Sequence, residues 1–182
     1  MQPQLESVVA ELRAALARLD RLAAGVTPEA WTRAPAPGRW SAAECVAHLN
    51  LTAAAYLPIL DAGLEEARRH GSDYRGRYRR DLLGWMLWRS VAEGGHVKSR
   101  TMPDFVPASA EPSPEVVQEF RELHEALIAR VVASDGLRID RVRMPSAFNP
   151  RIRYSIWSAF TILARHAHRH LRQAEVAAGR AG

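Results

Sequence analysis

The chain has 182 residues, 47% of them hydrophobic, which is enough for one compact domain with a sizeable core. We therefore expect residues 1–182 to form a single domain. The formal net charge of +5 comes almost entirely from arginine, and we attribute it to composition rather than to nucleic-acid binding. The single cysteine, Cys45, excludes an internal disulfide and a metal site built from several thiolates.

Neither a signal peptide nor a membrane span is expected. Residues 1–10 lack a basic start followed by an apolar segment. The longest uncharged stretch, Cys45–Leu60, is interrupted by polar residues and is shorter than the roughly 20 apolar residues of a spanning helix. We expect a soluble, cytoplasmic protein.

The first predicted helix occupies about residues 5–22, where leucine and valine recur at three- and four-residue spacing. Gly25 should end it. Thr27-Pro28-Glu29 is a helix-start signal that predicts a short turn around Trp31.

A second, long helix is predicted from about residue 42. Ser41-Ala42-Ala43-Glu44 has the capping-box pattern, in which the serine side chain accepts from the Glu44 N–H and the glutamate side chain accepts from the Ser41 N–H. Pro58 lacks the N–H of an intrahelical hydrogen bond, so we expect a kink or break there.

The remainder of the chain predicts three further helices and no convincing strand. Residues 82–91 should form a short helix, followed by a loop over residues 94–112. Ser113-Pro114 should start a third long helix that ends at Gly136, and a fourth should cover about Tyr154–Ala178. The predicted fold is an all-α, antiparallel four-helix bundle with a short extra helix and a long loop between its second and third long helices.

Two histidines in the last helix form the strongest candidate functional motif. His166 and His170 are four residues apart and therefore project from one face of a helix, one turn apart. His168 should face away from them. Two neutral imidazoles need one more side chain to form an open metal site, and His48 on the second helix is the natural third ligand. Helical periodicity leaves His124 as a rival.

Two segments carry a family resemblance. Residues 38–49, GRWSAAECVAHL, followed much later by residues 166–173, HAHRHLRQ, resemble the DinB-like superfamily. The resemblance implies a four-helix bundle, often dimeric, with a divalent metal held by three histidines, which correspond here to His48, His166 and His170. Zinc is expected from availability, while nickel or iron suits the same ligands.

The resemblance also implies metal-dependent chemistry at an open coordination position. Relatives include transferases and isomerases that use low-molecular-weight thiols such as bacillithiol or mycothiol, and many members are described as metal-dependent hydrolases. We therefore expect a small-molecule substrate, with a transferase or hydrolase activity. A bundle that binds metal or a small ligand without turnover, as a sensor or carrier, is the alternative.

Several neighbouring residues have both a structural and a functional interpretation. Glu44 could be a fourth ligand or general base, although the capping box already gives it a role. Cys45 is interpreted as a small buried residue rather than a nucleophile. Thr52 and Gln173 lie one turn beyond His48 and His170 and could orient an imidazole or a metal-bound water.

Aromatic and arginine residues receive the structural interpretation. We interpret the tryptophans as packing anchors, namely Trp31, Trp40, Trp85, Trp88 and Trp157. Nucleic-acid binding would draw on the segment from Tyr74 to Arg80, which holds four arginines. We do not expect this function, because the segment is short and no nucleic-acid motif accompanies it.

Overall fold

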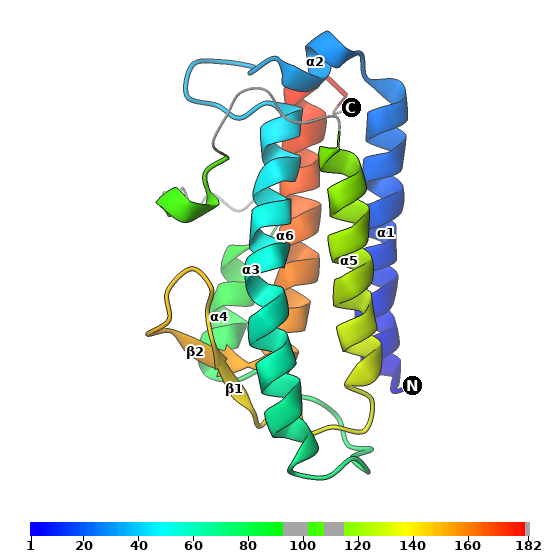
Figure 1. Ribbon diagram of the computed structural model, residues 1–182, viewed down its shortest axis with the longest axis vertical. Helices are drawn as coiled ribbons and strands as arrows, with labels where there is room; N and C mark the ends of the chain where they lie inside the picture. Colours follow the sequence, from blue (N-terminus) through cyan, green and yellow to red (C-terminus); the bar gives the residue numbers. More distant parts are fainter. Residues whose placement is uncertain (93–101, 108–114, 181–182) are drawn as a thin grey trace.

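The computed structural model describes residues 1–92, 102–107 and 115–180. Four long helices form a bundle and confirm the predicted all-α fold (Figure 1). They are α1 (Pro3–Gly25), α3 (Ala42–Arg68), α5 (Val116–Ala133) and α6 (Ile156–Ala177). The smaller elements are α2 (Pro28–Thr32), α4 (Leu82–Ser90), the 3-10 helix η1 (Pro103–Phe105), and the strands β1 (Arg143–Pro145) and β2 (Arg153–Ser155).

The predicted helix starts at Thr27 and Ser41 are present. Thr27 Oγ1 accepts a hydrogen bond from the Ala30 N–H. Ser41 and Glu44 form the complete capping box, with the Ser41 N–H donating to Glu44 Oε2 at 2.7 Å. The predicted start at Ser113-Pro114 and most of the predicted loop over residues 94–112 lie outside the described residues.

Side-chain contacts between neighbouring helices show whether the two helices run in the same or in opposite directions. Asn50 with Glu119 and Asp61 with Arg130 join α3 to α5 in the same direction. Arg121 with Asp20 joins the start of α5 to the end of α1, so these two helices are antiparallel. His48 lies beside His166, whereas Gly63, further along α3, lies beside Ile156 at the start of α6, so α3 and α6 are antiparallel as well (Figure 1).

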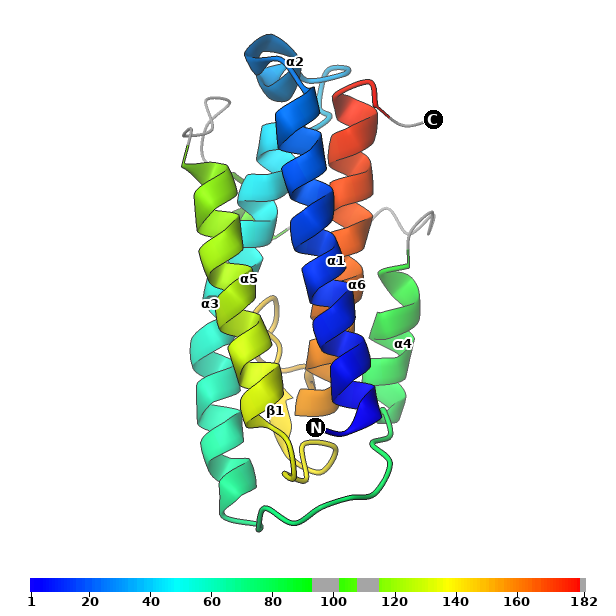
Figure 2. The same ribbon diagram turned by 90° about the vertical axis from the view of Figure 1, so that its right-hand side faces the viewer.

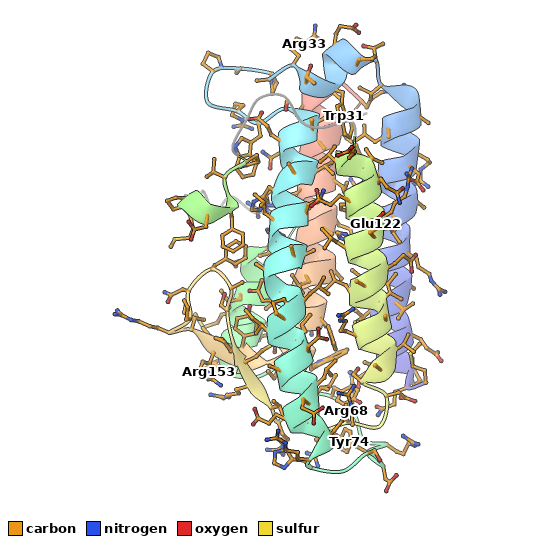
Figure 3. The ribbon with its side chains drawn as sticks, in the orientation of Figure 1. Trp31, Arg33, Arg68, Tyr74, Glu122 and Arg153 are labelled. Atoms are coloured by element: carbon orange, nitrogen blue, oxygen red, sulfur yellow. The ribbon has the colours of Figure 1, made fainter. Side chains whose placement is uncertain are left out.

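The long connection between α3 and α5 explains why these two helices run in the same direction. It carries α4 and η1 and returns the chain to the end of the bundle from which α3 started (Figure 2). Trp31 marks that end, and Arg68 and Tyr74 mark the opposite one (Figure 3). The bundle is thus antiparallel within the pairs α1–α5 and α3–α6.

Pro58 does not break α3, which continues to Arg68, so the predicted break is wrong. Pro58 and Ala54, whose carbonyl loses its helical partner, both lie on the exposed face of the helix. Water can therefore satisfy the Ala54 carbonyl, and the buried face of α3 keeps its packing.

Strands β1 and β2 are a feature that the sequence pattern did not predict. They form a two-stranded antiparallel sheet in which Met144 is opposite Tyr154. Three residues are too few to show the alternation that identifies a strand. The sheet lies beside α3 and α4 (Figure 1), and Phe148 in the loop between its strands brings its ring near that of His166 in α6.

Helix α3 contributes much of the core. By length and composition alone it could cross a membrane, yet 56% of its most apolar window is buried inside the bundle. Its buried residues include Leu60 and Leu64, which belong to the same cluster as Leu5 and Leu12 of α1. This burial is typical of the central helix of a bundle.

Asp81 joins the start of α4 to the start of α6. Its carboxylate accepts hydrogen bonds from the Gly84 N–H at 3.1 Å, the Ser155 N–H at 2.9 Å and the Ser158 hydroxyl at 2.9 Å. A Cβ atom on Gly84 would collide with the Ser158 side chain, so glycine is required for this close approach.

Replacement of Asp81 by alanine should destabilise the protein by about 2–4 kcal/mol, because it removes a helix cap and leaves buried donors unpaired. Burial is the largest influence and raises the pKa of Asp81, but hydrogen bonds from Ser155, Gly84 and Ser158 together hold it below the ordinary 3.8. The stability difference should therefore be constant above pH 4 and shrink as the pH falls through the lowered pKa.

Urea denaturation followed by circular dichroism at several pH values measures this difference. Asp73→Ala is the matched control, because Asp73 is exposed. Equal denaturation midpoints for Asp81→Ala and wild type at neutral pH would contradict the proposed role.

Candidate metal centre

Three histidines converge near the middle of the contact between α3 and α6. His48 comes from α3, and His166 and His170 come from successive turns of α6. One ring nitrogen from each lies within 4.8 Å of the other two. His48 Nε2 and His166 Nε2 are 3.4 Å apart. The structure thus brings together all three residues that the sequence singled out as metal ligands.

A backbone carbonyl fixes the tautomer of His48. His48 Nδ1 lies 2.7 Å from the carbonyl oxygen of Phe105 in η1. Since a carbonyl only accepts, Nδ1 carries the proton and Nε2 presents its lone pair to the other histidines. Sequence reasoning missed this contact, because nothing in the pattern around Phe105 indicates that its carbonyl faces an imidazole 57 positions away.

Burial keeps the three imidazoles neutral. It lowers the pKa of His48 against the opposing effect of the Phe105 hydrogen bond. Burial, followed by the charges of His170 and His48, lowers the pKa of His166 well below its ordinary value. Burial, followed by the charge of His48, lowers the pKa of His170 to about 3. A metal ion would not compete with protons for these nitrogens at neutral pH.

The geometry and the chemistry of this donor set fit a divalent metal ion. Two nitrogens at about 2.0–2.1 Å from a tetrahedral zinc ion are separated by ~3.3 Å, close to the distance between His48 Nε2 and His166 Nε2. The buried Nδ1 atoms of His166 and His170 have no hydrogen-bond partner among the residues that the structure describes. Three neutral imidazoles with unused lone pairs are ligands that zinc, nickel and iron accept.

Aromatic rings enclose the three histidines. The Trp40 ring lies 4.9 Å from the His48 ring and 6.0 Å from the His170 ring, measured between centroids. Phe148, from the loop between β1 and β2, lies 6.1 Å from the His166 ring and 4.2 Å from Phe105. Trp40, which we interpreted as a packing anchor, thus packs against the histidine cluster and covers it.

The other tryptophans differ in exposure. Trp157 is 4% exposed and stacks on Tyr78, as expected for a packing anchor. Trp85 is 46% exposed on α4, so that prediction is wrong for this residue. A residue on a short helix at the edge of a bundle has no second layer to cover it.

A cavity of about 380 Å³ opens beside the three histidines. The loop between the strands, α4 and α6 supply its walls, with apolar side chains from Leu87, Val91, Ile152, Ile162 and Leu163. His48, His166 and His170 all line it. A small molecule could therefore reach a metal ion held by these residues.

Three hydroxyl groups line the same cavity. The Tyr56 hydroxyl lies 3.1 Å from Ser146 Oγ and hydrogen-bonds to the Tyr154 hydroxyl. Burial raises the pKa of both tyrosines, so both keep their protons. These two contacts use two of the three hydroxyl hydrogens. The Ser146 side chain also hydrogen-bonds to Tyr154, so the three hydroxyl groups form one polar cluster in the cavity wall.

Thr52, Gln173 and Glu44, which were predicted to support the site, differ in the contacts that they make. The Thr52 hydroxyl lines the cavity and donates to the backbone carbonyl of His48 at 2.9 Å, and its predicted role in orienting an imidazole or a metal-bound water stays a prediction. The Gln173 side chain interacts with the His170 imidazole and opposes the lowering of its pKa. Glu44 acts in the capping box, and its proposed role as a base or fourth ligand stays a prediction.

The other histidines that the structure describes lie outside the cluster. His124 is buried on α5, donates from Nδ1 to the Phe120 carbonyl at 3.0 Å and stacks on the Phe120 ring. Burial lowers its pKa to about 4. His168 faces α1, where Nε2 lies 3.0 Å from the Glu11 carbonyl oxygen. Among the described residues, only His48 joins His166 and His170.

Cys45 should be unreactive towards disulfide reagents such as Ellman's reagent in the folded protein. Its side chain is 0% exposed and packs with Leu22, Ala42 and Ala174. Burial, followed by the charge of Glu44, raises the pKa of the thiol to about 12, so almost no thiolate exists at pH 7–9. Reaction should occur in denaturant, and rapid reaction in buffer would restore Cys45 as a candidate nucleophile.

The comparisons with known proteins agree with this geometry. The sequence model described as the DinB superfamily matches residues 11–174, which includes all three histidines. Neither the curated proteins nor the solved structures that were compared gave a match. A family match over nearly the whole length, together with a helical bundle that gathers three histidines, establishes that the chain belongs to the DinB superfamily.

Proposed function

We propose that this protein is a metal-dependent enzyme in which His48, His166 and His170 hold a divalent ion that acts on a small molecule in the adjacent cavity. The observation that carries the proposal is the position of three neutral imidazoles in the wall of a cavity of about 380 Å³. A purely structural cluster would not need access to such a space. Zinc is proposed first, with nickel or iron as alternatives.

The reaction class follows from an open coordination position. A divalent ion with three neutral ligands supplies a Lewis acid that lowers the pKa of a bound water or thiol. Cys45, the single cysteine, is buried among apolar side chains and does not line the cavity, so it supplies no thiolate to this site. We propose a transferase that uses a low-molecular-weight thiol, or a hydrolase that uses water.

The residues of this chain position the reactants. The Phe105 carbonyl orients His48, and Trp40 and Phe148 exclude water from the histidine cluster. The Tyr56, Ser146 and Tyr154 hydroxyls form a polar cluster in the cavity wall that suits a polar group of the substrate. The apolar walls favour a substrate with a hydrocarbon part.

The cellular setting is also part of the proposal. A free, buried cysteine agrees with a reducing compartment, so we propose a cytoplasmic protein that acts without a membrane. We further propose a homodimer, as in many members of the superfamily. Nucleic acid is not a proposed partner, because Tyr78 of the arginine-rich segment is buried and cannot stack on bases.

Metal analysis tests the proposal directly. Untagged protein purified without added metal or chelator should carry about one divalent ion per chain, measured by inductively coupled plasma mass spectrometry. The variant His166→Ala/His170→Ala should carry none, because a single imidazole does not retain a divalent ion. His70→Ala, at an exposed histidine outside the cluster, is the control and should keep its metal.

Circular dichroism of each variant shows whether the helices persist. No metal in the wild-type protein, even after reconstitution with zinc, nickel and iron, would overturn the proposal. Metal retained by the double variant would place the ion elsewhere. Metal bound without turnover, in a screen of electrophiles with small thiols and of esters and amides, would favour a sensor or carrier.

Replacement of Tyr154 by phenylalanine should weaken substrate binding with less effect on the chemical step, because the hydroxyl lies in the cavity wall and belongs to no proposed metal ligand. We expect KM to rise about tenfold, as for the loss of one hydrogen bond, while kcat changes less. Steady-state kinetics with a substrate from the screen measures both. Tyr74→Phe is the control, and an unchanged KM in Tyr154→Phe would contradict the role of the hydroxyl group.

A further inference from the structure

A second, larger cavity of about 720 Å³ lies on the opposite side of α6 from the histidines. It is lined from α6 by Trp157, Thr161, Ala164, Arg165 and His168, whereas the first cavity is lined by Ile162, Leu163, His166, Arg169 and His170. At 100° per residue these two sets occupy opposite faces of the helix. Helices α1 and α4 supply the remaining walls, on either side of α6 (Figure 2).

Three arginines line this second cavity. Arg77 and Arg80 precede α4, and Arg165 belongs to α6. The guanidinium carbons of Arg80 and Arg165 lie 4.2 Å and 4.0 Å from the centre of the Trp88 ring. The Arg80 Nε–H donates to Thr161 Oγ1 at 3.0 Å, which holds the guanidinium group in place. Contact with an aromatic ring offsets part of the cost of bringing two cations together.

The positive charge of this cluster is not neutralised by its surroundings. Within the described part of the chain, Arg77, Arg80 and Arg165 form no ion pair with a carboxylate. Glu11 supplies the one carboxylate that lines the cavity, and it is 3.2 Å from His168 Nε2. Burial, followed by the charge of Arg165, lowers the pKa of Arg80, as expected for unneutralised neighbouring cations.

We propose that this cavity binds a small molecule that carries a phosphate group. Guanidinium groups bind phosphate through paired N–H donors, and the two terminal nitrogens of Arg80 remain available after Nε has bonded to Thr161. Three guanidinium groups against one carboxylate match the double negative charge of a phosphate monoester. The cations converge in a hollow instead of following a stripe, which suits a small molecule better than a polymer backbone.

The test is a titration of full-length, 15N-labelled protein with inorganic phosphate and with pyrophosphate at constant ionic strength, followed by nuclear magnetic resonance. We expect a saturable shift of the Trp88 indole N–H resonance, which Trp88→Phe assigns. Arg80→Gln/Arg165→Gln should weaken binding at least tenfold. Arg77→Gln leaves the Trp88 contacts intact, so it keeps the test valid if the double variant fails to fold, and it should weaken binding several-fold.

The matched control is Arg13→Gln/Arg151→Gln, which removes the same charge at exposed positions outside the cavity. It should bind like the wild type. Absence of a saturable shift at Trp88, or equal weakening by the control, would overturn the proposal. A thymidine oligonucleotide that binds at the same arginines more tightly with increasing length would assign the phosphate to nucleic acid and would also overturn it.

Discussion

Three imidazole rings are buried at the contact between α3 and α6, and the rest of the site depends on keeping them there uncharged. His48 is 2% exposed and His166 is 9% exposed, so protonation of either would place a charge in the bundle interior. Buried ring nitrogens without partners cost free energy, which the packing of four long helices must offset. A bound divalent ion would take one nitrogen of each ring and couple metal binding to the stability of the contact between α3 and α6.

The short elements, more than the long helices, form the cavity through which a small molecule reaches this buried cluster, and they orient its side chains. Phe105 of η1 fixes His48, and the loop between β1 and β2 supplies Phe148 and Ser146. Asp81 ties the start of α6 to the start of α4, which forms one wall of the cavity. Helix α6 has two different faces. One carries the histidines, and the other carries Arg165, whose guanidinium group lies against the Trp88 ring.

Local sequence patterns were sufficient for the histidine pair on α6 but not for its surroundings. His166 and His170 share a face because of helix geometry, which depends only on their spacing. The Phe105 carbonyl and the hydroxyls of Ser146 and Tyr154 come from three-residue elements and a loop, whose path no periodicity specifies. The hydroxyl of Thr52 donates within its own helix, a local alternative that spacing alone does not exclude.

The sequence by itself determined the long helices, the capping box at Ser41 and the histidine pair His166 and His170, because each depends on short-range spacing. Only the tertiary structure decided that α3 and α5 run in the same direction, that α3 continues through Pro58, and that two three-residue strands close one side of the cavity. These features depend on contacts between residues far apart in the chain and on which helix face meets water. The second cavity belongs with them, since Arg80 and Arg165 meet at Trp88 only after α4 has packed against α6.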